Sequence, residues 1–238
     1  SPQVGGGKTE QQFLAALDKK LWTAADRLRS SLDAAVYKHA VLGLIFLKYI
    51  SDSFEMRRGE LAASMMSRDG EYFVDPEEFK KSAPNVQEAQ RQWEAAIDAE
   101  LEERDYYTAK NVFWVPALAR WSNIQASAKL PIGTKITIGA GTGGRSSALV
   151  YTMGSLGKLI DDALDAVEKE NPKLKNVLNK TYTQLQIEQS NLSSLIDLIA
   201  TIPFHHGSLH AKDILGHVNE YFLGQFALAE GKKGGQYY

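Results

Sequence analysis

The sequence predicts a mainly α-helical fold, a bundle-like domain with a small β-hairpin inserted near residues 130–155. Apolar residues recur every three or four positions along most of the chain, which is the period of a helix that packs one face on a core. The stretch 40–47 is apolar almost all round and should be the centre of the bundle. A glycine-rich stretch, 139–144, separates two β-prone runs and predicts the hairpin.

The composition is that of an ordinary globular protein. Of the 238 residues, 44% are apolar and 24% are charged, and 27 basic against 29 acidic side chains leave a net charge of −2. This balance excludes a global attraction to nucleic acid or to an anionic membrane, so any contact with DNA must come from a local patch or from a partner. The absence of cysteine excludes disulfides, thiolate zinc sites and cysteine nucleophiles. The apolar run 40–47 is too short to span a bilayer. The lack of cysteine suits a cytoplasmic protein, which is the location that we expect.

The N-terminal part predicts a flexible leader, residues 1–9, and two long helices. The leader is glycine-rich and lacks the apolar core of a signal peptide. Thr9 is expected to cap a first helix that runs through Leu28. Asp33 is expected to open a second helix of about two dozen residues that ends near Phe54. Gly43 lowers helix propensity there by roughly 1 kcal/mol relative to alanine, so we expect a neighbouring helix to pack closely against it.

The middle of the chain is less regular. Residues 57–85 hold the breakers Gly70, Pro76 and Pro84, with 71–74 as a candidate short extended piece. Helical period returns between 86 and 101. Residues 111–116 are aromatic and close on a proline, which predicts an extended edge segment, and another helix is expected from 118 to 129.

Three more helices are expected in the C-terminal part. The first follows Ser155 and is stopped by Pro172, and the second is capped by Asn191 and ended by Pro203. The third, 212–230, ends at Gly231, since glycine readily takes the left-handed conformation that follows a helix. Residues 231–238 are glycine-rich, locally basic and aromatic.

The glycine-rich stretch 139–144 has a second interpretation, as the phosphate-binding loop of a small nucleotide-binding enzyme. Such a fingerprint needs a strand, a loop and a helix in that order, with an acidic residue about 20 positions further on. Residues 145–151 indicate a returning strand instead, and the lysine and hydroxyl of a P-loop are missing. A flexible hairpin is therefore favoured.

Metal chemistry is not favoured either. Four of the five histidines cluster near the C-terminus: His205, His206, His210 and His217. Pro203 and Gly207 argue against the helix that a paired-histidine site would need, and no glutamate or cysteine completes a ligand set. Four carboxylates line one helix: Asp161, Asp162, Asp165 and Glu168. A carboxylate metal site needs side chains from several helices, so a solvated face is favoured and no metal site is predicted.

The first helix carries a modest basic cluster: Lys19, Lys20, Arg27 and Arg29. Such a cluster is either a solvated face or a patch that contacts phosphates, and the neutral overall charge favours the solvated face. No nucleophile-elbow motif is present, and we predict no catalytic residue in these 238 positions.

Five blocks of the sequence resemble the amino-terminal helical region of the modification (M) subunit of type I restriction-modification systems. They are Leu21-Trp22 with Asp26 and Leu28-Arg29; Tyr37 through Tyr49-Ile50-Ser51-Asp52; Phe113-Trp-Val-Pro116 with Ala119-Arg-Trp121; Gly157-Lys-Leu-Ile-Asp-Asp162 through Glu170-Asn-Pro172; and residues 212–238. Together they cover nearly the whole chain after the leader, and their order and spacing make the combination specific.

This resemblance implies an S-adenosylmethionine-dependent adenine-N6 DNA methyltransferase. It also implies that the enzyme acts on double-stranded DNA in a complex with a specificity subunit, a second M subunit and a restriction subunit. The helical domain, residues 10–230, would help to close around DNA and would contact neighbouring subunits. A mobile arm over the duplex suits an enzyme that must take its target base out of the stack. The candidate DNA contacts are Lys19, Lys20, Arg27, Arg29, Lys232 and Lys233.

The sequence departs from the family in two respects. Residues 130–155 look like an insertion, and neither the Asn/Asp-Pro-Pro-aromatic motif nor a cofactor-binding βαβ domain is present. We therefore expect a catalytically silent fragment whose residues 231–238 lead into a missing methyltransferase domain. By the family match, Gln236, Tyr237 and Tyr238 would lie beside S-adenosylmethionine in the full-length protein. The alternative is a self-contained helical protein-interaction module without methylase activity.

Overall fold

The computed structural model describes residues 9–29, 34–139, 149–202, 204, 213–214, 216–217 and 220. Within this part the chain is mostly helical and contains one two-stranded antiparallel sheet, which confirms the predicted fold class. The elements, in order, are α1 (Glu10–Arg29), α2 (Ala34–Met66), α3 (Glu77–Lys80), α4 (Val86–Glu100), α5 (Asp105–Thr108), η1 (Ala117–Ala119), α6 (Trp121–Ser127), β1 (Lys135–Ile138), β2 (Leu149–Thr152), α7 (Leu156–Glu170), η2 (Pro172–Leu174) and α8 (Gln189–Ala200).

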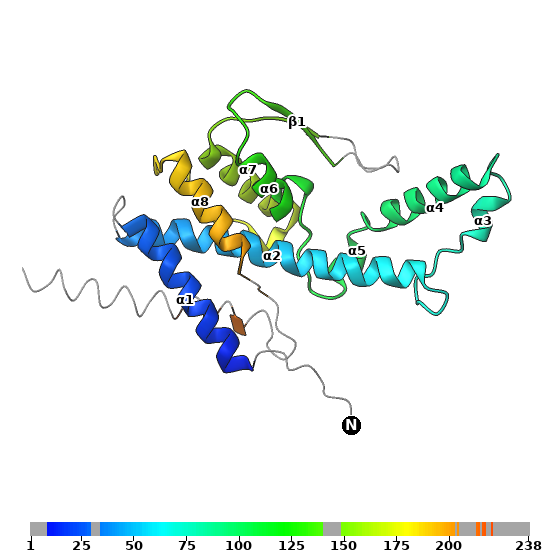
Figure 1. The fold of residues 1–238 in the computed structure, drawn as a ribbon, viewed down its shortest axis with the longest axis horizontal. Helices are drawn as coiled ribbons and strands as arrows, with labels where there is room; N and C mark the ends of the chain where they lie inside the picture. The colour runs from blue at the N-terminus through cyan, green and yellow to red at the C-terminus, as the bar shows by residue number, and fades with distance from the viewer. Residues whose placement is uncertain are drawn as a thin grey trace, which may run out of the picture.

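The described helices form a body and an arm (Figure 1). In the body, α1, α6 and α8 pack on α2, and α7 packs on α8. The arm, which we define as residues 55–105, consists of the distal half of α2 with α3 and α4, and it extends away from the body (Figure 1). No helix in the described ranges combines the length and the apolar character needed to cross a bilayer.

Helix α1 is capped by Thr9, as its sequence predicts, and the cap is a reciprocal capping box with Gln12. The Thr9 hydroxyl accepts the N–H of Gln12 at 3.2 Å, and the Gln12 side chain accepts the N–H of Thr9 at 3.1 Å. Phe13, Leu17 and Leu21 then form the buried stripe of this helix, which packs on α2 and α8. The cap and the stripe together fix where this helix starts and which face it buries.

Helix α2 is the central helix, but its predicted end near Phe54 is wrong. It continues to Met66 for 33 residues in all, and Leu61 and Met65 extend the buried stripe that Phe54 begins. Beyond Phe54 only one face of the helix is covered, so the apolar residues become sparse and the pattern weakens. Asp33, predicted to open this helix, lies outside the described residues.

Gly43 of α2 has a close neighbour, as expected, but the neighbour is a loop side chain and not a helix. The Tyr182 hydroxyl donates a hydrogen bond to the carbonyl of Ala40, and a Cβ added at Gly43 would overlap that hydroxyl. Gly157 of α7 faces the same residue, because a Cβ there would lie 2.7 Å from the Tyr182 carbonyl oxygen. Two glycines therefore make room for one tyrosine between α2 and α7. Burial raises the pKa of Tyr182.

The predicted hairpin is present. Strands β1 and β2 pair antiparallel, with Ile136 opposite Tyr151 and Ile138 opposite Leu149. The strand that follows the glycine-rich stretch thus returns beside the first, so β1 is followed by an antiparallel strand and not by the helix that a dinucleotide site requires. The nucleotide-binding interpretation is therefore wrong for β1 and β2, and residues 140–148 between them lie outside the described part.

Other local predictions fail wholly or in part. Residues 111–116 are not helical, as predicted, but they are not an edge segment, since Trp114 and Val115 are buried and no described strand pairs with them. The stretch 71–74 is likewise not a strand, and α3 lies within the region predicted to be irregular. Helix α8 starts at Gln189 and not after a cap at Asn191.

The helix predicted from 118 to 129 is interrupted at Arg120, whose backbone is extended. Helix α6 therefore begins at Trp121, and the hydroxyl of Ser51 on α2 accepts the N–H of Trp121 at 2.8 Å. This cap comes from a residue 70 positions away, so local sequence does not show it.

Gly43, which lies against Tyr182, and Gly59, which is exposed, provide a matched test of the Tyr182 contact. We expect Gly43→Ala to lower the free energy of unfolding by about 1–3 kcal/mol, because the buried Tyr182 hydroxyl must move. Gly59→Ala should raise it by about 0.5–1 kcal/mol, because nothing lies within 4 Å of the new Cβ. Urea unfolding measures both. Equal effects of the two substitutions would contradict the close contact.

Candidate functional site

Three aromatic rings meet where the arm joins the body. Phe54 of α2 stacks on Tyr107 with ring centroids 4.7 Å apart and planes 17° from parallel. Trp114 meets both rings edge-on, at 5.3 Å from Phe54 and 5.2 Å from Tyr107. Tyr107 follows the arm in the chain and Trp114 belongs to the block 113–116, so this aromatic cluster ties the returning chain to α2. Edge-to-face and offset stacked pairs contribute roughly 0.5–1.5 kcal/mol each beyond the area they bury.

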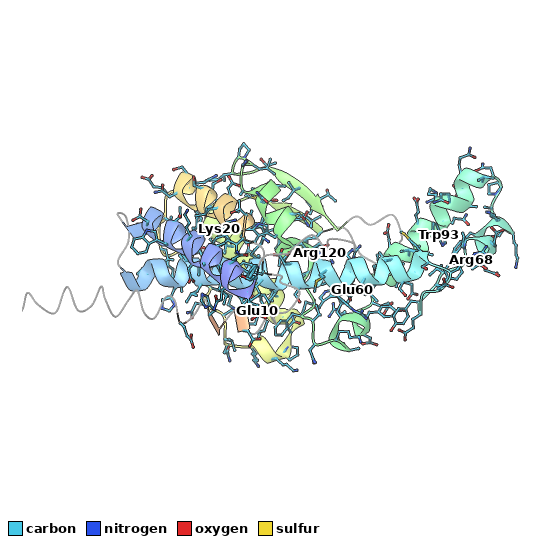
Figure 2. All side chains as sticks on the ribbon, turned by 60° about the horizontal axis from the view of Figure 1, so that its bottom comes forward. Glu10, Lys20, Glu60, Arg68, Trp93 and Arg120 are labelled. Atoms are coloured by element: carbon cyan, nitrogen blue, oxygen red, sulfur yellow. The ribbon has the colours of Figure 1, made fainter. Side chains whose placement is uncertain are left out.

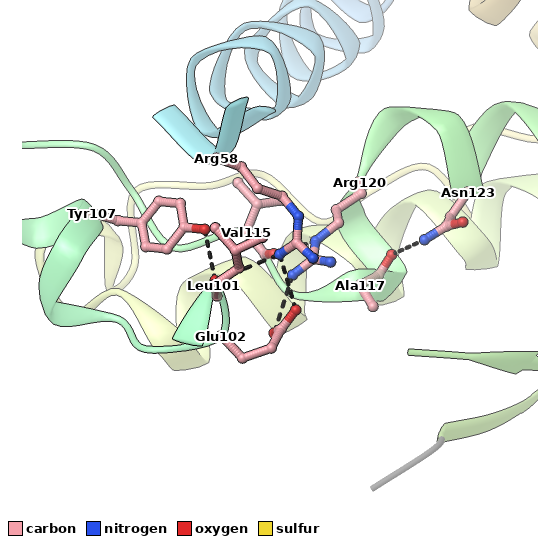
Figure 3. A network of polar contacts seen from close by, with 8 residues as sticks. All are labelled: Arg58, Leu101, Glu102, Tyr107, Val115, Ala117, Arg120 and Asn123. Atoms are coloured by element: carbon pink, nitrogen blue, oxygen red, sulfur yellow. Dashed lines mark hydrogen bonds and ion pairs between the residues drawn. The ribbon is translucent and has the colours of Figure 1, made fainter. Parts of the chain in front are cut away.

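Arg120 joins this aromatic cluster to Glu102, just after α4, and Figure 3 shows its contacts with Glu102 and Val115. Its guanidinium lies over Phe54, 4.7 Å from the ring centroid, and its Nε donates to the carbonyl of Val115 at 3.1 Å. A second nitrogen of Arg120 pairs with Glu102 at 3.5 Å, and Arg58 pairs with the other oxygen of Glu102 at 3.0 Å. One carboxylate from the arm is therefore held by two guanidinium groups, one of them from the body.

The neighbouring backbone is held in the same network. The Tyr107 hydroxyl donates to the carbonyl of Leu101 at 2.7 Å, and Arg58 approaches the same carbonyl (Figure 3). Burial raises the pKa of Tyr107, although the guanidinium groups of Arg58 and Arg120 oppose that shift. The charged groups of this network pair with one another and join the arm to the body.

Asn171 holds the buried segment 113–116 from the other side. Its side-chain oxygen accepts the N–H of Trp114 at 3.2 Å, and its amide donates to the carbonyls of Trp114 at 2.9 Å and Val167 at 2.8 Å. The Asn171 side chain thus bonds both the N–H and the carbonyl of Trp114, as a neighbouring strand would. Trp114 therefore needs no strand partner. Asn171 is only 7% exposed, so these bonds form away from water.

A groove of about 790 Å³ opens beside Asn171, and we call it the Asn171 groove. It is lined by Thr108, Asn111, Val112, Phe113, Glu170, Asn171, Pro172 and Lys173. Two of the blocks that carry the family resemblance, 113–116 and 170–172, therefore meet in one concave surface.

The four carboxylates of α7 do not form the solvated face that the sequence predicts. Asp161 accepts the N–H groups of Tyr182 and Thr183, each at 3.0 Å. Asp162 accepts the Tyr151 hydroxyl at 2.6 Å and also pairs with a lysine of its own helix. All four are half-buried. The reason is that the connector between α7 and α8, residues 171–188, and the hairpin fold back onto α7 and supply partners from distant positions.

The two remaining α7 carboxylates share a lysine from the connector. Lys180 lies 3.3 Å from Asp165 and 3.3 Å from Glu168. The pKa of Asp165 is lowered, chiefly by its hydrogen bond with Lys169. Among the described residues, no group of three or more His, Asp or Glu side chains is placed to hold a metal ion.

The predicted DNA-contact residues fall into three groups. Lys19 is exposed on α1. The Lys20 ammonium contacts the backbone carbonyl and hydroxyl of Thr201, just beyond α8, where a cation offsets the negative helix end. Arg27 and Arg29 belong to the last turn of α1, but their side chains lie outside the described part, as do Lys232 and Lys233.

The predicted cofactor residues Gln236, Tyr237 and Tyr238 also lie outside the described residues, as do His205, His206 and His210. His217 is described, and its Nε2 lies 2.6 Å from a carboxylate oxygen of Asp18 on α1. A buried lysine of α2, Lys48, pairs with Asp52 and donates to the carbonyl of Ile202. The chain that follows α8 is thus tied to both α1 and α2.

Sequence reasoning missed Arg120, Asn171 and Tyr182. Arg120 and Asn171 lie within blocks of family resemblance, but nothing in their local pattern shows which distant backbone groups they bond. A polar residue inside an otherwise apolar or aromatic block, such as Arg120 between Ala119 and Trp121, is the signal that could have been followed.

Asn171→Asp tests the amide bridge with almost no change in shape. The introduced carboxylate would face two carbonyl oxygens, so its folded-state pKa should rise above the unfolded value of about 3.9. The substitution should therefore cost about 2–4 kcal/mol at pH 7 and progressively less as the pH falls toward 4, where the carboxyl protonates. Unfolding curves at several pH values measure this dependence.

Asn85→Asp is the matched control for that test. Asn85 caps α4 by accepting the N–H of Glu88 at 2.7 Å, and aspartate caps helices equally well. We expect it to be neutral or mildly stabilising at pH 7. A pH-independent loss at Asn171 would argue against the bridge.

Comparison with known proteins shows the family to which this chain is related. A family model described as the HsdM N-terminal domain matches residues 17–199. The type I restriction enzyme MjaIX methylase subunit of Methanocaldococcus jannaschii is 29% identical over 223 residues, which cover 93% of this chain and 32% of that protein. The HindI methylase subunit of Haemophilus influenzae is 43% identical over 131 residues, which cover 52% of this chain and 27% of that protein.

The matched residues thus cover 32% of the first relative and 27% of the second, so the chain spans about a third of the length of these curated relatives. The family model covers well over half of the chain and includes the aromatic cluster, the Arg120 network and Asn171. By that match, the chain belongs to the family of HsdM N-terminal domains found in type I restriction enzyme methylase subunits.

Proposed function

We propose that this chain is the DNA-clamping and subunit-contact domain of a type I restriction-modification M subunit. The full-length form would be a site-specific adenine-N6 DNA methyltransferase that uses S-adenosylmethionine and works in the cytoplasm. The 238 residues would be catalytically silent on their own. Family membership and the names of the two relatives, both methylase subunits, support this proposal.

A segregation of charge carries the proposal for DNA. The arm holds 14 acidic and 7 basic residues, whereas the rest of the chain holds 15 acidic and 20 basic residues. DNA phosphates are repelled by the arm and attracted by the rest of the chain. Figure 2 shows Lys20 on the body and Arg68 and Trp93 on the arm, with Arg120 between them. We therefore place the DNA-facing surface on the body, where the candidate residues of α1 lie.

Lys19 is the best-placed candidate for a phosphate contact, because its side chain is exposed on α1. Lys20 already contacts Thr201, so we assign it a smaller share of DNA binding. Arg27, Arg29, Lys232 and Lys233 complete the proposed set. A lysine that contacts one phosphate releases about one counterion, which makes its contribution depend on salt.

Methyl transfer would depend on residues beyond those described. When bound, S-adenosylmethionine supplies the methyl group for the adenine amine. We propose that Gln236, Tyr237 and Tyr238 lie beside it in the full-length subunit. The described residues form an antiparallel hairpin and helices, without a βαβ unit to bind the cofactor.

The subunit contacts would be protein surfaces of the body. The Asn171 groove supports this part of the proposal, since it is built from two blocks of family resemblance. Its partners would be the specificity subunit, the second M subunit or the restriction subunit. The alternative, a self-contained interaction module without methylase activity, uses the same groove but leaves the names of the relatives unexplained.

DNA binding provides the first test, in the full-length M subunit assembled with its specificity subunit. We expect Lys19→Glu to weaken binding of duplex DNA for all sequences alike and to reduce the salt slope by about 1. Lys81→Glu changes charge by the same amount on the exposed face of the arm and should leave binding unchanged. Fluorescence anisotropy at several salt concentrations measures both. Equal losses in the two variants would contradict the assignment of the DNA-facing surface.

Cofactor binding provides the second test. In calorimetry the full-length subunit should bind S-adenosylmethionine, Tyr237→Ala should weaken that binding by roughly tenfold, and Tyr237→Phe should restore most of it. The 238-residue chain alone should show neither tight binding nor methylation of DNA. Tight binding by that chain would overturn the assigned division of roles.

A further inference from the structure

The distal half of α2 carries a stripe of apolar and small residues on its uncovered face. The stripe consists of Met56, Gly59, Ala63 and Met66, and we call it the α2 seam. Met56 is 43% exposed and Met66 is 51% exposed, and both Gly59 and Ala63 are exposed. The spacings of three, four and three residues are those of a and d positions in a heptad repeat. The seam therefore has the period of a helix–helix contact.

The opposite face of the same helix fixes the direction in which the seam points. Phe54, Leu61 and Met65 are buried there, so the helix cannot rotate to cover the seam. A Cβ added at Gly59 would meet no atom within 4 Å, which shows open space at the centre of the seam. Single exposed apolar residues are common, but a line of them along one helix face marks a contact surface.

The size of the residues in the seam indicates what could lie on it. Glycine and alanine at the centre let a second helix approach closely, because little side chain separates the two backbones. Methionine at each end is flexible and adapts to the shape of a partner. The seam thus provides shallow holes for larger side chains, such as leucine, from a docked helix.

The charges beside the seam indicate the sign of the partner. Glu55 and Glu60 are exposed on its two flanks, Glu60 being paired with Arg57 at 3.4 Å, and the arm as a whole holds 14 acidic against 7 basic residues. A docked helix would be favoured by basic residues at its own flanking positions. A second copy would place Glu55 and Glu60 near their counterparts, and DNA would meet the acidic arm, so both are disfavoured.

We propose that the α2 seam docks an amphipathic helix of a partner protein, with large apolar residues along a narrow stripe and lysine or arginine on both sides of it. The contact is helix-in-groove recognition on the arm, and it is separate from the DNA-facing surface of the body. It does not depend on the methylase assignment, because it follows from the exposure, spacing and charge of residues 55–66.

A designed peptide tests the proposal on the 238-residue chain. The probe is a fluorescein-labelled helical peptide of three heptads, with leucine at a and d and lysine at e and g. A matched peptide carries glutamate at e and g. In fluorescence anisotropy the lysine peptide should bind at least about tenfold more tightly than the glutamate peptide.

Ala63→Glu separates seam docking from a general attraction to acidic surface. A peptide held only by charge would bind this variant more tightly, whereas a peptide in the seam should bind at least about tenfold more weakly. Ala15→Glu is the matched control, an exposed alanine of α1 remote from the seam, and should leave binding unchanged. Unchanged or tighter binding to Ala63→Glu would overturn the proposal.

Reversing the charges beside the seam should create binding of the glutamate peptide. A misfolded variant would lose binding and could not produce this gain. The double substitution Glu55→Lys with Glu60→Lys should move the preference from the lysine peptide toward the glutamate peptide. Sedimentation of the chain without peptide tests the second-copy alternative. Self-association that Ala63→Glu abolishes would replace the partner helix by a second copy and contradict the proposal.

Discussion

The guanidinium of Arg120 lies at the point where the body and the arm meet, and the arrangement of the domain depends on it. It lies on the Phe54 ring, donates to the Val115 carbonyl and pairs with Glu102 at the end of α4. These three partners belong to the central helix, the segment that returns from the arm and the arm itself. A lysine could not make the same set of contacts, because it lacks the planar fork that stacks and bonds at once.

The second constraint is the length of α2, which runs from the core of the body into the arm. Its proximal half is covered by α1, α6 and α8, and Gly43 makes room there for Tyr182. Its distal half is covered on one face only, so it is the support of an arm with its own surface. The division of charge follows the same boundary, with acidic residues in excess on the arm and basic residues in excess elsewhere. The single helix α2 therefore joins a part of the chain with excess positive charge to an arm with excess negative charge.

Much of the fold could be predicted from local pattern. The capping residues Thr9 and Ser155, the apolar stripe of α7 and the hairpin are all encoded by neighbours within a few positions. The end of α2, the conformation of 111–116 and the partners of the α7 carboxylates could not be predicted in this way. Each depends on a group that is distant in sequence, such as Asn171 for Trp114 or Lys180 for Asp165. The candidate site was predicted less well than the fold, because its positioning residues act through such distant bonds.

The distance between the arm and the body tests the central claim most directly, that the Arg120 network holds the arm in one orientation. The chain has no cysteine, so spin labels at Gln11→Cys on α1 and Gln90→Cys on α4 would be the only ones. Pulsed electron resonance should give one narrow distance distribution, which Arg120→Met broadens and Arg91→Met, at an exposed arginine of α4, leaves unchanged. A broad distribution in the parent chain, or an unchanged one in Arg120→Met, would contradict the account.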